Sequence, residues 1–200
     1  MKSAIFLSTM TLVAGLAACS SQNSEYEPAL KADLQKHGAC AAVTSAKLPI
    51  EYKLPKALDS SETVSLLKEK MRVPDALVKV GLLRVVGDFQ DGLGLPIRRY
   101  DLSKEGGAHY FSEKAGTRSL GGFCYAPEEL ISIDSVDKAG MEQGGGEVKV
   151  KYTAKVGPTQ AWVKDPTITQ LLKDKLMAEG QKVSGESVLK KVSNGWEVVH

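Results

Sequence analysis

One segment of the chain, EVKVKYTAKV at residues 147–156, has the strictest pattern in the sequence. Apolar side chains stand at every second position, and three of the positions between them are the lysines Lys149, Lys151 and Lys155. A period of two places alternate side chains on opposite faces of a β-strand. We therefore predict a half-buried strand that turns five residues into the core, namely Val148, Val150, Tyr152, Ala154 and Val156.

The segments on either side of this strand predict further strands of an antiparallel sheet. Ile131 and Ile133 alternate with polar residues ahead of it, and the glycine-rich stretch 140–146 predicts a long hairpin connection. Nearer the C-terminus, Asn194-Gly195 is typical of a two-residue hairpin turn. We therefore expect the chain to end in a β-hairpin that extends the sheet.

Helical patterns lie on both sides of the predicted sheet segments. Asp165-Pro166 opens a predicted helix over 167–178, which we expect to cover the apolar face of the sheet. In the N-terminal half, apolar spacing predicts three helices, over 29–37, from Ser60 or Ser61 to Met71, and over 75–83. The stretch 87–122 is rich in glycine and predicts only one strand, over 97–102. The sequence thus predicts the α+β class, with helices in the N-terminal half and an antiparallel sheet with a covering helix in the C-terminal half.

Length and charge restrict the classes of function. The chain has 200 residues, 26 basic and 24 acidic side chains and a net charge of +2, so it has no basic excess for binding nucleic acid. Beyond the N-terminus, no stretch approaches the roughly 20 apolar residues of a membrane-spanning helix. We expect no nucleic-acid partner and one α+β domain over residues 28–200, with a sub-boundary near 90–120 as the alternative.

The N-terminus has the order of a secretory signal. A basic start at Lys2 precedes the apolar stretch 4–16, and small residues follow. The sequence Leu-Ala-Ala-Cys at residues 16–19 resembles the lipobox of bacterial lipoproteins. That resemblance implies that residues 1–18 are a lipoprotein signal peptide and that Cys19 carries acyl chains in the membrane. The alternative is an ordinary secretory signal in which Cys19 is an unmodified thiol.

The residues that follow the lipidated cysteine predict the final location. Ser20 and Ser21 stand where an aspartate would retain an enterobacterial lipoprotein in the inner membrane, so the resemblance implies the outer membrane. Residues 19–27 are short and polar, which is typical of a tether. We therefore expect a lipid-anchored protein whose domain lies in the periplasm.

The remaining two cysteines, Cys40 and Cys124, form an even pair in an exported chain. This favours a disulfide between them. The alternatives are two buried free thiols or a pair of metal ligands. A metal site is disfavoured because the three histidines are far apart and no C-x-x-C or H-x-x-x-H spacing occurs. We predict the disulfide, with no metal and no cofactor.

Two features are candidates for contact with a partner. Trp162 lies between two prolines near lysines, where an indole anchors a partner or fills the end of the core. Lys149, Lys151 and Lys155 either meet an anionic polymer or form a solvated strand face. No nucleophile, base or carboxylate pair has a spacing that predicts catalysis, and the Ser65-to-Lys68 match to S-x-x-K lacks its companion motifs.

Two functions follow. The first is a non-enzymatic envelope lipoprotein whose domain binds an unidentified envelope protein or polymer or has a structural role. The alternative is a lipid-anchored hydrolase that acts on cell-wall or polysaccharide substrates. A pocket in which catalytic groups converge favours the hydrolase, whereas an exposed apolar surface favours the binding domain.

Overall fold

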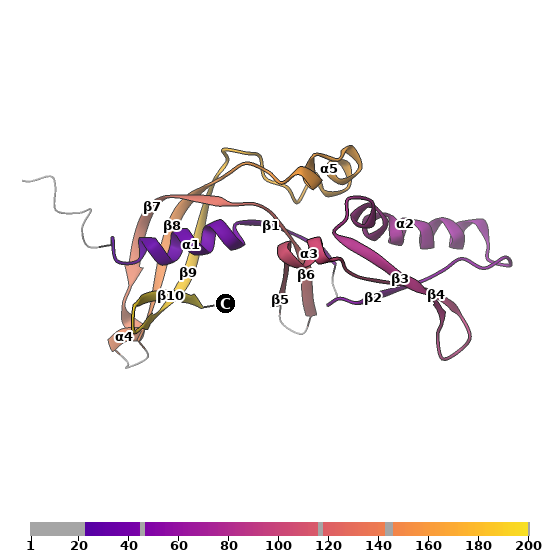
Figure 1. Ribbon diagram of the computed structural model, residues 1–200, viewed down its shortest axis with the longest axis horizontal. Helices are drawn as coiled ribbons and strands as arrows, with labels where there is room; N and C mark the ends of the chain where they lie inside the picture. Colours follow the sequence, from indigo (N-terminus) through magenta and orange to yellow (C-terminus); the bar gives the residue numbers. More distant parts are fainter. Residues whose placement is uncertain (1–22, 45–46, 116–117, 143–145, 200) are drawn as a thin grey trace, which may run out of the picture.

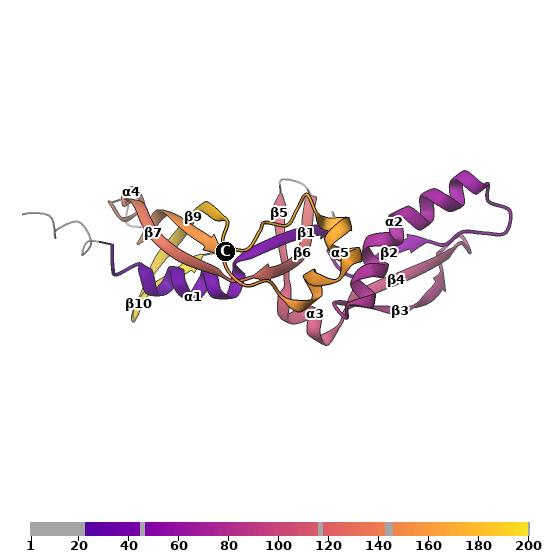
Figure 2. The same ribbon diagram turned by 90° about the horizontal axis from the view of Figure 1, so that it is seen from above.

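The computed structural model describes residues 23–44, 47–115, 118–142 and 146–199. Over these residues the chain is an elongated α+β molecule whose three antiparallel sheets follow one another along the long axis (Figure 1). Helix α1 (Glu27–His37) and a four-stranded sheet lie at one end, and α2 (Ser61–Lys79) and a three-stranded sheet at the other (Figure 2).

The four-stranded sheet contains the strictly alternating segment. Its strand order is β10-β9-β8-β7, and the bounds are Glu128–Asp137 for β7, Glu147–Val156 for β8, Lys182–Val192 for β9 and Gly195–Val199 for β10. The five apolar residues predicted to point inward from β8 are all buried, and the three lysines between them are exposed. The alternation, the pairing of β7 with β8 and the C-terminal hairpin are therefore confirmed. A short helix, α4 (Ala139–Glu142), precedes β8.

Helix α1 covers the apolar face of this sheet (Figure 1). Tyr26, Leu30 and Leu34 are spaced four apart, so they share one side of the helix and pack on the buried residues of β8. The prediction that the helix over 167–178 covers this sheet is wrong. Helix α5 (Pro166–Leu172) ends earlier and packs in a different cluster. Helical spacing identifies an apolar side, but it does not show which sheet that side meets.

The middle sheet joins distant parts of the chain. Its order is β1-β6-β5, with bounds Ala39–Thr44 for β1, Tyr110–Ala115 for β5 and Arg118–Ala126 for β6. The helix α3 (Lys104–His109), the 3-10 helix η1 (Ala161–Lys164) and α5 lie beside it (Figure 1). Phe123, Trp162 and Ile168 are buried together in this region. The strands of this sheet were not predicted from the sequence.

The sheet at the far end has the order β2-β4-β3, with bounds Ile50–Lys53 for β2, Leu83–Gln90 for β3 and Pro96–Leu102 for β4. The predicted strand over 97–102 is confirmed as β4, but 87–122 is far more regular than expected. The two helices predicted around Pro74 are one continuous helix, α2, with Pro74 inside it. An interior proline costs about 3 kcal/mol, and Pro74 is buried, as are Met71 and Leu77 of the same helix. Burial of apolar surface is favourable and opposes this cost.

The core consists of two clusters, one under α1 and one that extends from the far sheet to the middle sheet. Residues on both sides of 90–120, such as Leu83 and Phe123, share the second cluster, so this stretch does not separate the cores. Tyr26 is buried in the first cluster, so the domain begins before the end of the predicted tether. No helix in the described part of the chain is long and apolar enough to cross a membrane.

Candidate functional site

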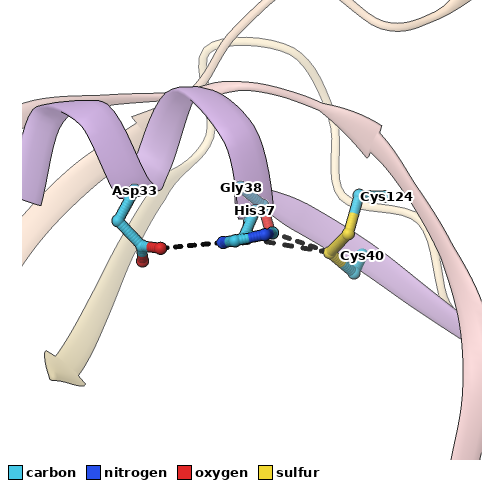
Figure 3. Close-up of a disulfide and its surroundings, with 5 residues drawn as sticks. All are labelled: Asp33, His37, Gly38, Cys40 and Cys124. Carbon is cyan, nitrogen blue, oxygen red and sulfur yellow. Dashed lines mark hydrogen bonds and ion pairs between the residues drawn. A yellow bond between two sulfur atoms is a disulfide. The ribbon is translucent and has the colours of Figure 1, made fainter. Parts of the chain in front are cut away.

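The predicted disulfide between Cys40 and Cys124 is present (Figure 3). The two cysteines lie directly opposite each other on the antiparallel strands β1 and β6, with their Cα atoms 3.8 Å apart. They are separated by 84 positions in the sequence. The bond therefore fixes the strand that leaves α1 to the middle sheet.

The last turn of α1 lies beside this disulfide. His37 Nδ1 is 2.8 Å from Asp33 Oδ1, four positions back on the same helix, and Figure 3 shows this pair next to the cysteines. Cys40 Sγ is 3.2 Å from the carbonyl oxygen of Gly38. A disulfide sulfur has no proton to donate, so this is a packing contact. The end of α1, the disulfide and the middle sheet thus form one connected surface.

A groove with a volume of about 870 Å³ opens on this surface, and we call it the disulfide groove. Its lining comes from α1, from β1 and β6 at the disulfide, and from β5, β9 and β10. The lining residues are Asp33, His37, Cys40, Tyr110, Phe111, Ser112, Glu113, Cys124, Glu186, Ser187, Val188, Val198 and Val199. Aromatic and valine side chains supply apolar surface, and the only formal charges among these residues are carboxylates, apart from histidine. The groove is therefore apolar with an acidic margin.

Two strand edges border the disulfide groove. Strand β5 is the last strand of the middle sheet. Strand β9 pairs with β10 only along 188–192, so within the described residues no strand pairs with 182–187 on the side away from β8. An unpaired edge offers backbone N–H and C=O groups to an added strand. The groove therefore combines apolar side chains with backbone groups suited to an extended polypeptide.

A second hollow of about 460 Å³ shares Asp33 and His37 with the disulfide groove, and we call it the Glu128 hollow. Gly38 brings the end of α1 onto the start of β7, because a Cβ there would lie 2.5 Å from the Glu128 nitrogen. Gly185 on β9 leaves space for a tyrosine ring, since its Cβ would lie 2.4 Å from Tyr152 Cζ. Two close approaches thus assemble this hollow from α1, β7, β8 and β9.

Glu128 is 8% exposed and is the buried charged residue of the described chain. Among the described residues, none donates a hydrogen bond to its carboxyl or forms an ion pair with it. Burial raises the pKa of the Glu128 carboxyl. Burial also raises the pKa of Tyr152, a hydrogen bond from Ser187 lowers it, and the carboxylates of Glu128 and Asp33 raise it further. The hollow therefore holds a desolvated carboxyl close to a phenol.

The neighbouring residues Glu128 and Glu129 show which part of the candidate site could be predicted from the sequence. Adjacent residues on a strand point to opposite faces, so no carboxylate pair was predicted there. In the structure Glu129 is exposed and binds Lys155 Nζ at 2.8 Å, while Glu128 points inward. The sequence could not indicate that Glu128 meets Asp33 and His37, which come from a helix almost one hundred residues earlier.

Trp162 lies in the core, 9% exposed, with its ring centroid 6.3 Å from that of Phe123. Its Nε1 has no hydrogen-bond partner among the described residues. The ring borders a separate hollow of about 500 Å³ with His109 and Asp165, apart from the disulfide groove. Of the two roles considered for Trp162, its burial favours that of a core residue over that of an exposed anchor for a partner.

The three lysines of β8 lie on the face of the sheet opposite α1. Lys155 is paired with Glu129, and Lys151 lies opposite Glu186 in the β9 register. No ion pair to Lys149 or Lys151 occurs among the described residues. Glu186 and Val188, the cross-strand neighbours of Lys151 and Lys149, also line the disulfide groove, so this mixed face adjoins the groove. The structure does not bring the lysines together with Trp162.

Exposed apolar residues also occur at the α2 end. Leu58 and Leu93 are 98% and 85% exposed, but they lie in different loops, and Leu66 lies on α2. Phe89 is half-covered by the Arg99 guanidinium, 5.0 Å from its ring centroid. Val85, Val86 and Phe89 are each 41% exposed on β3, but neither they nor these leucines line any of the hollows described above.

Cys19 lies outside the described residues, so its predicted lipidation stays a prediction. In the described part of the chain, no group of three or more histidine, cysteine, aspartate or glutamate side chains is arranged to hold a metal ion. Comparisons with protein-family models, with curated proteins and with solved structures found no match to this chain. The assignment of a function therefore depends on the geometry of the disulfide groove and the Glu128 hollow.

Proposed function

We propose that this chain is an envelope lipoprotein, anchored in the outer membrane through Cys19, whose periplasmic domain binds a partner protein without catalysing a reaction. The single observation that supports binding is the disulfide groove, which has room for a chain segment between two strand edges. The predicted anchor precedes α1, the helix whose last turn lines the groove. A short tether would therefore hold the groove near the membrane.

The physical argument is that an added strand has its hydrogen bonds ready at such an edge. An extended segment of the partner would pair its backbone with β5 or with the unpaired part of β9, and its apolar side chains would cover Phe111 and Val188. The lysine face of β8, which adjoins the groove at Glu186 and Val188, stays a second candidate surface for an anionic polymer.

The test is photocrosslinking in cells from single positions of the anchored protein. A benzoylphenylalanine at Ser112, an exposed residue in the groove, should give a discrete crosslinked product. The matched control is the same replacement at Ser135, an exposed serine on β7 outside the groove. No product from Ser112, or the same product from both positions, would contradict the proposal.

The anchor has its own test. Cys19→Ser should release the chain from the membrane fraction or leave it as an unprocessed precursor, because the described chain offers no membrane-spanning helix in its place. If the variant is matured and still sediments with membranes, the lipoprotein assignment is wrong.

One observation favours the hydrolase as a second candidate. Glu128, whose pKa is raised by burial, shares a hollow with Asp33, and two carboxyl groups in one site are the arrangement of many glycoside hydrolases. Asp33 is, however, held by His37. Release of soluble fragments from purified cell wall by the wild-type chain, lost in Glu128→Gln, would establish the hydrolase instead.

A further inference from the structure

The Glu128 hollow has a chemical character of its own. Its side walls include the apolar residues Leu34, Val183 and Met177, and its carboxyl groups are those of Glu128 and Asp33, with the His37 imidazole beside Asp33. Asp33 already has its partner in His37, but the carboxyl of Glu128 has neither an ion pair nor a hydrogen bond among the described residues. The hollow thus presents apolar walls and one acid that no described group of the protein binds.

A buried carboxyl without a partner is unfavourable, and a cation that reaches it removes the deficit. A lysine side chain carries its ammonium group on an alkyl stem that packs well against apolar walls. The volume of about 460 Å³ is ample for such a side chain. Among the described residues, no lysine or arginine lines the hollow, so no cation of the described chain occupies the space beside Glu128.

We propose that the Glu128 hollow is a recognition pocket for an alkylammonium group, such as a lysine side chain, with Glu128 as its counter-ion. This rests on the proposed function, because the hollow meets the disulfide groove at Asp33 and His37. A partner segment lying along the unpaired edge of β9 passes the mouth of the hollow at Val183 to Gly185. A lysine at one position of that segment enters the pocket and sets the register of binding.

Sugar and anionic ligands fit the hollow less well. Tyr152, its one aromatic residue, is buried and has its hydroxyl beside Glu128 and Asp33, so no open aromatic face is offered to a sugar ring. Two carboxyl groups among the lining residues repel an anion. The chemistry of the lining therefore favours a cation with an alkyl stem.

The test titrates the mature chain with n-butylammonium chloride and follows the backbone amide resonances of Gly38, Ser184 and Gly185 by NMR. We expect saturable shifts with the ammonium and none with n-butanol, which has the same alkyl length without the charge. Glu128→Gln should weaken binding by about tenfold or more, because a charge-assisted hydrogen bond is lost. Glu129→Gln, which changes the exposed neighbour, should bind as the wild type does.

The absence of saturable shifts, equal binding of n-butanol, or undiminished binding to Glu128→Gln would overturn the pocket. If Glu128→Gln fails to fold, the wild-type comparison of n-butylammonium with n-butanol still decides. Failure of this test with crosslinking from Ser112 intact removes the cation pocket and leaves the binding groove. Loss of the crosslink with ammonium binding intact removes the partner and leaves the pocket.

Discussion

Each end of the molecule contains an antiparallel sheet and one long helix. The two ends differ in whether their charged side chains have partners and whether their strand edges are paired. At the α2 end, Arg98, Arg99 and Arg84 pair with Asp88, Glu51 and Asp101, which lie on facing strands of the same sheet. At the α1 end, Glu128 is buried without a partner and part of β9 has no neighbouring strand. A surface whose charges are paired with one another offers little to a charged ligand, and this is why we place the proposed binding site at the α1 end.

The largest expected loss in the free energy of unfolding comes from placing a charge in the core beneath α1. Val150 is fully buried between the sheet and the helix, and Val150→Asp buries an uncompensated charge that costs several kcal/mol. That is a large part of a typical total of about 5–15 kcal/mol, so we expect an unfolded or barely stable α1 end. Urea denaturation followed by circular dichroism measures the loss. The adjacent Lys151→Gln should change the free energy of unfolding by less than about 0.5 kcal/mol, and a larger loss in this variant would reverse the assigned faces.

The disulfide comes next in size. Replacing Cys40 and Cys124 together by alanine should lower the free energy of unfolding by about 2–5 kcal/mol, since the bond closes a long loop in the unfolded chain. Denaturant midpoints of the oxidised wild type and the double variant measure this. A loss below about 1 kcal/mol would show that strand pairing between β1 and β6 suffices to hold α1 in place.

Removing the charge of Glu128 should increase the free energy of unfolding, and this increase should depend on pH. Burial raises the pKa of Glu128 in the folded state, so the folded protein holds this proton more tightly than the unfolded chain. Its favourable contribution is present below the unfolded pKa, about 4.5, and is lost as the pH rises through the folded pKa. Glu128→Gln should therefore stabilise the chain by roughly 1 kcal/mol at pH 7 and not at pH 4. Thermal melts at both values check this, and destabilisation at pH 7 would mean that the carboxylate has a stabilising partner.

Apart from the Lys151→Gln control, the smallest effect belongs to the α2 end. Arg98 binds Asp88 through Nε at 2.8 Å, but both side chains are partly exposed. Exposed ion pairs contribute about 0–1 kcal/mol, so Arg98→Gln should lower the free energy of unfolding by less than about 1 kcal/mol. The same urea titration measures it. A loss as large as that of the disulfide would mean that this end also depends on a few critical groups.

The sequence predicted the elements whose pattern is local. Four predicted features are present: the alternation of β8, the C-terminal hairpin, the helix predicted over residues 29–37 and the disulfide. Each depends on neighbouring residues or, for the disulfide, on the number of cysteines. The sequence failed for several elements that depend on long-range packing, among them the strands of the middle sheet and the placement of α5. Pro74 stays inside α2 because it is buried, and β3 escaped notice because an irregular register between Val85 and Gly87 disturbs its alternation.

The candidate site was hidden for the same reason. Asp33 and His37 belong to α1, Glu128 begins β7, and Tyr152 was identified only as a core residue. Their meeting depends on which sheet α1 covers, and apolar spacing does not specify this. The one available signal was Gly38 between α1 and Cys40, since a glycine at the end of a helix permits close packing.

The most direct measurement compares one carboxyl from each end in a single NMR titration of the side-chain carboxyl carbons. Hydrogen bonding from Arg98 lowers the pKa of Asp88 below its usual 3.8, whereas burial raises the pKa of Glu128 above its usual 4.5. We expect the two titrations to separate in these opposite directions, with Glu128 protonating first as the pH falls. A Glu128 carboxyl that titrates at or below 4.5 would show that it already has a partner, and would contradict the account of an open, unpaired acid at the α1 end.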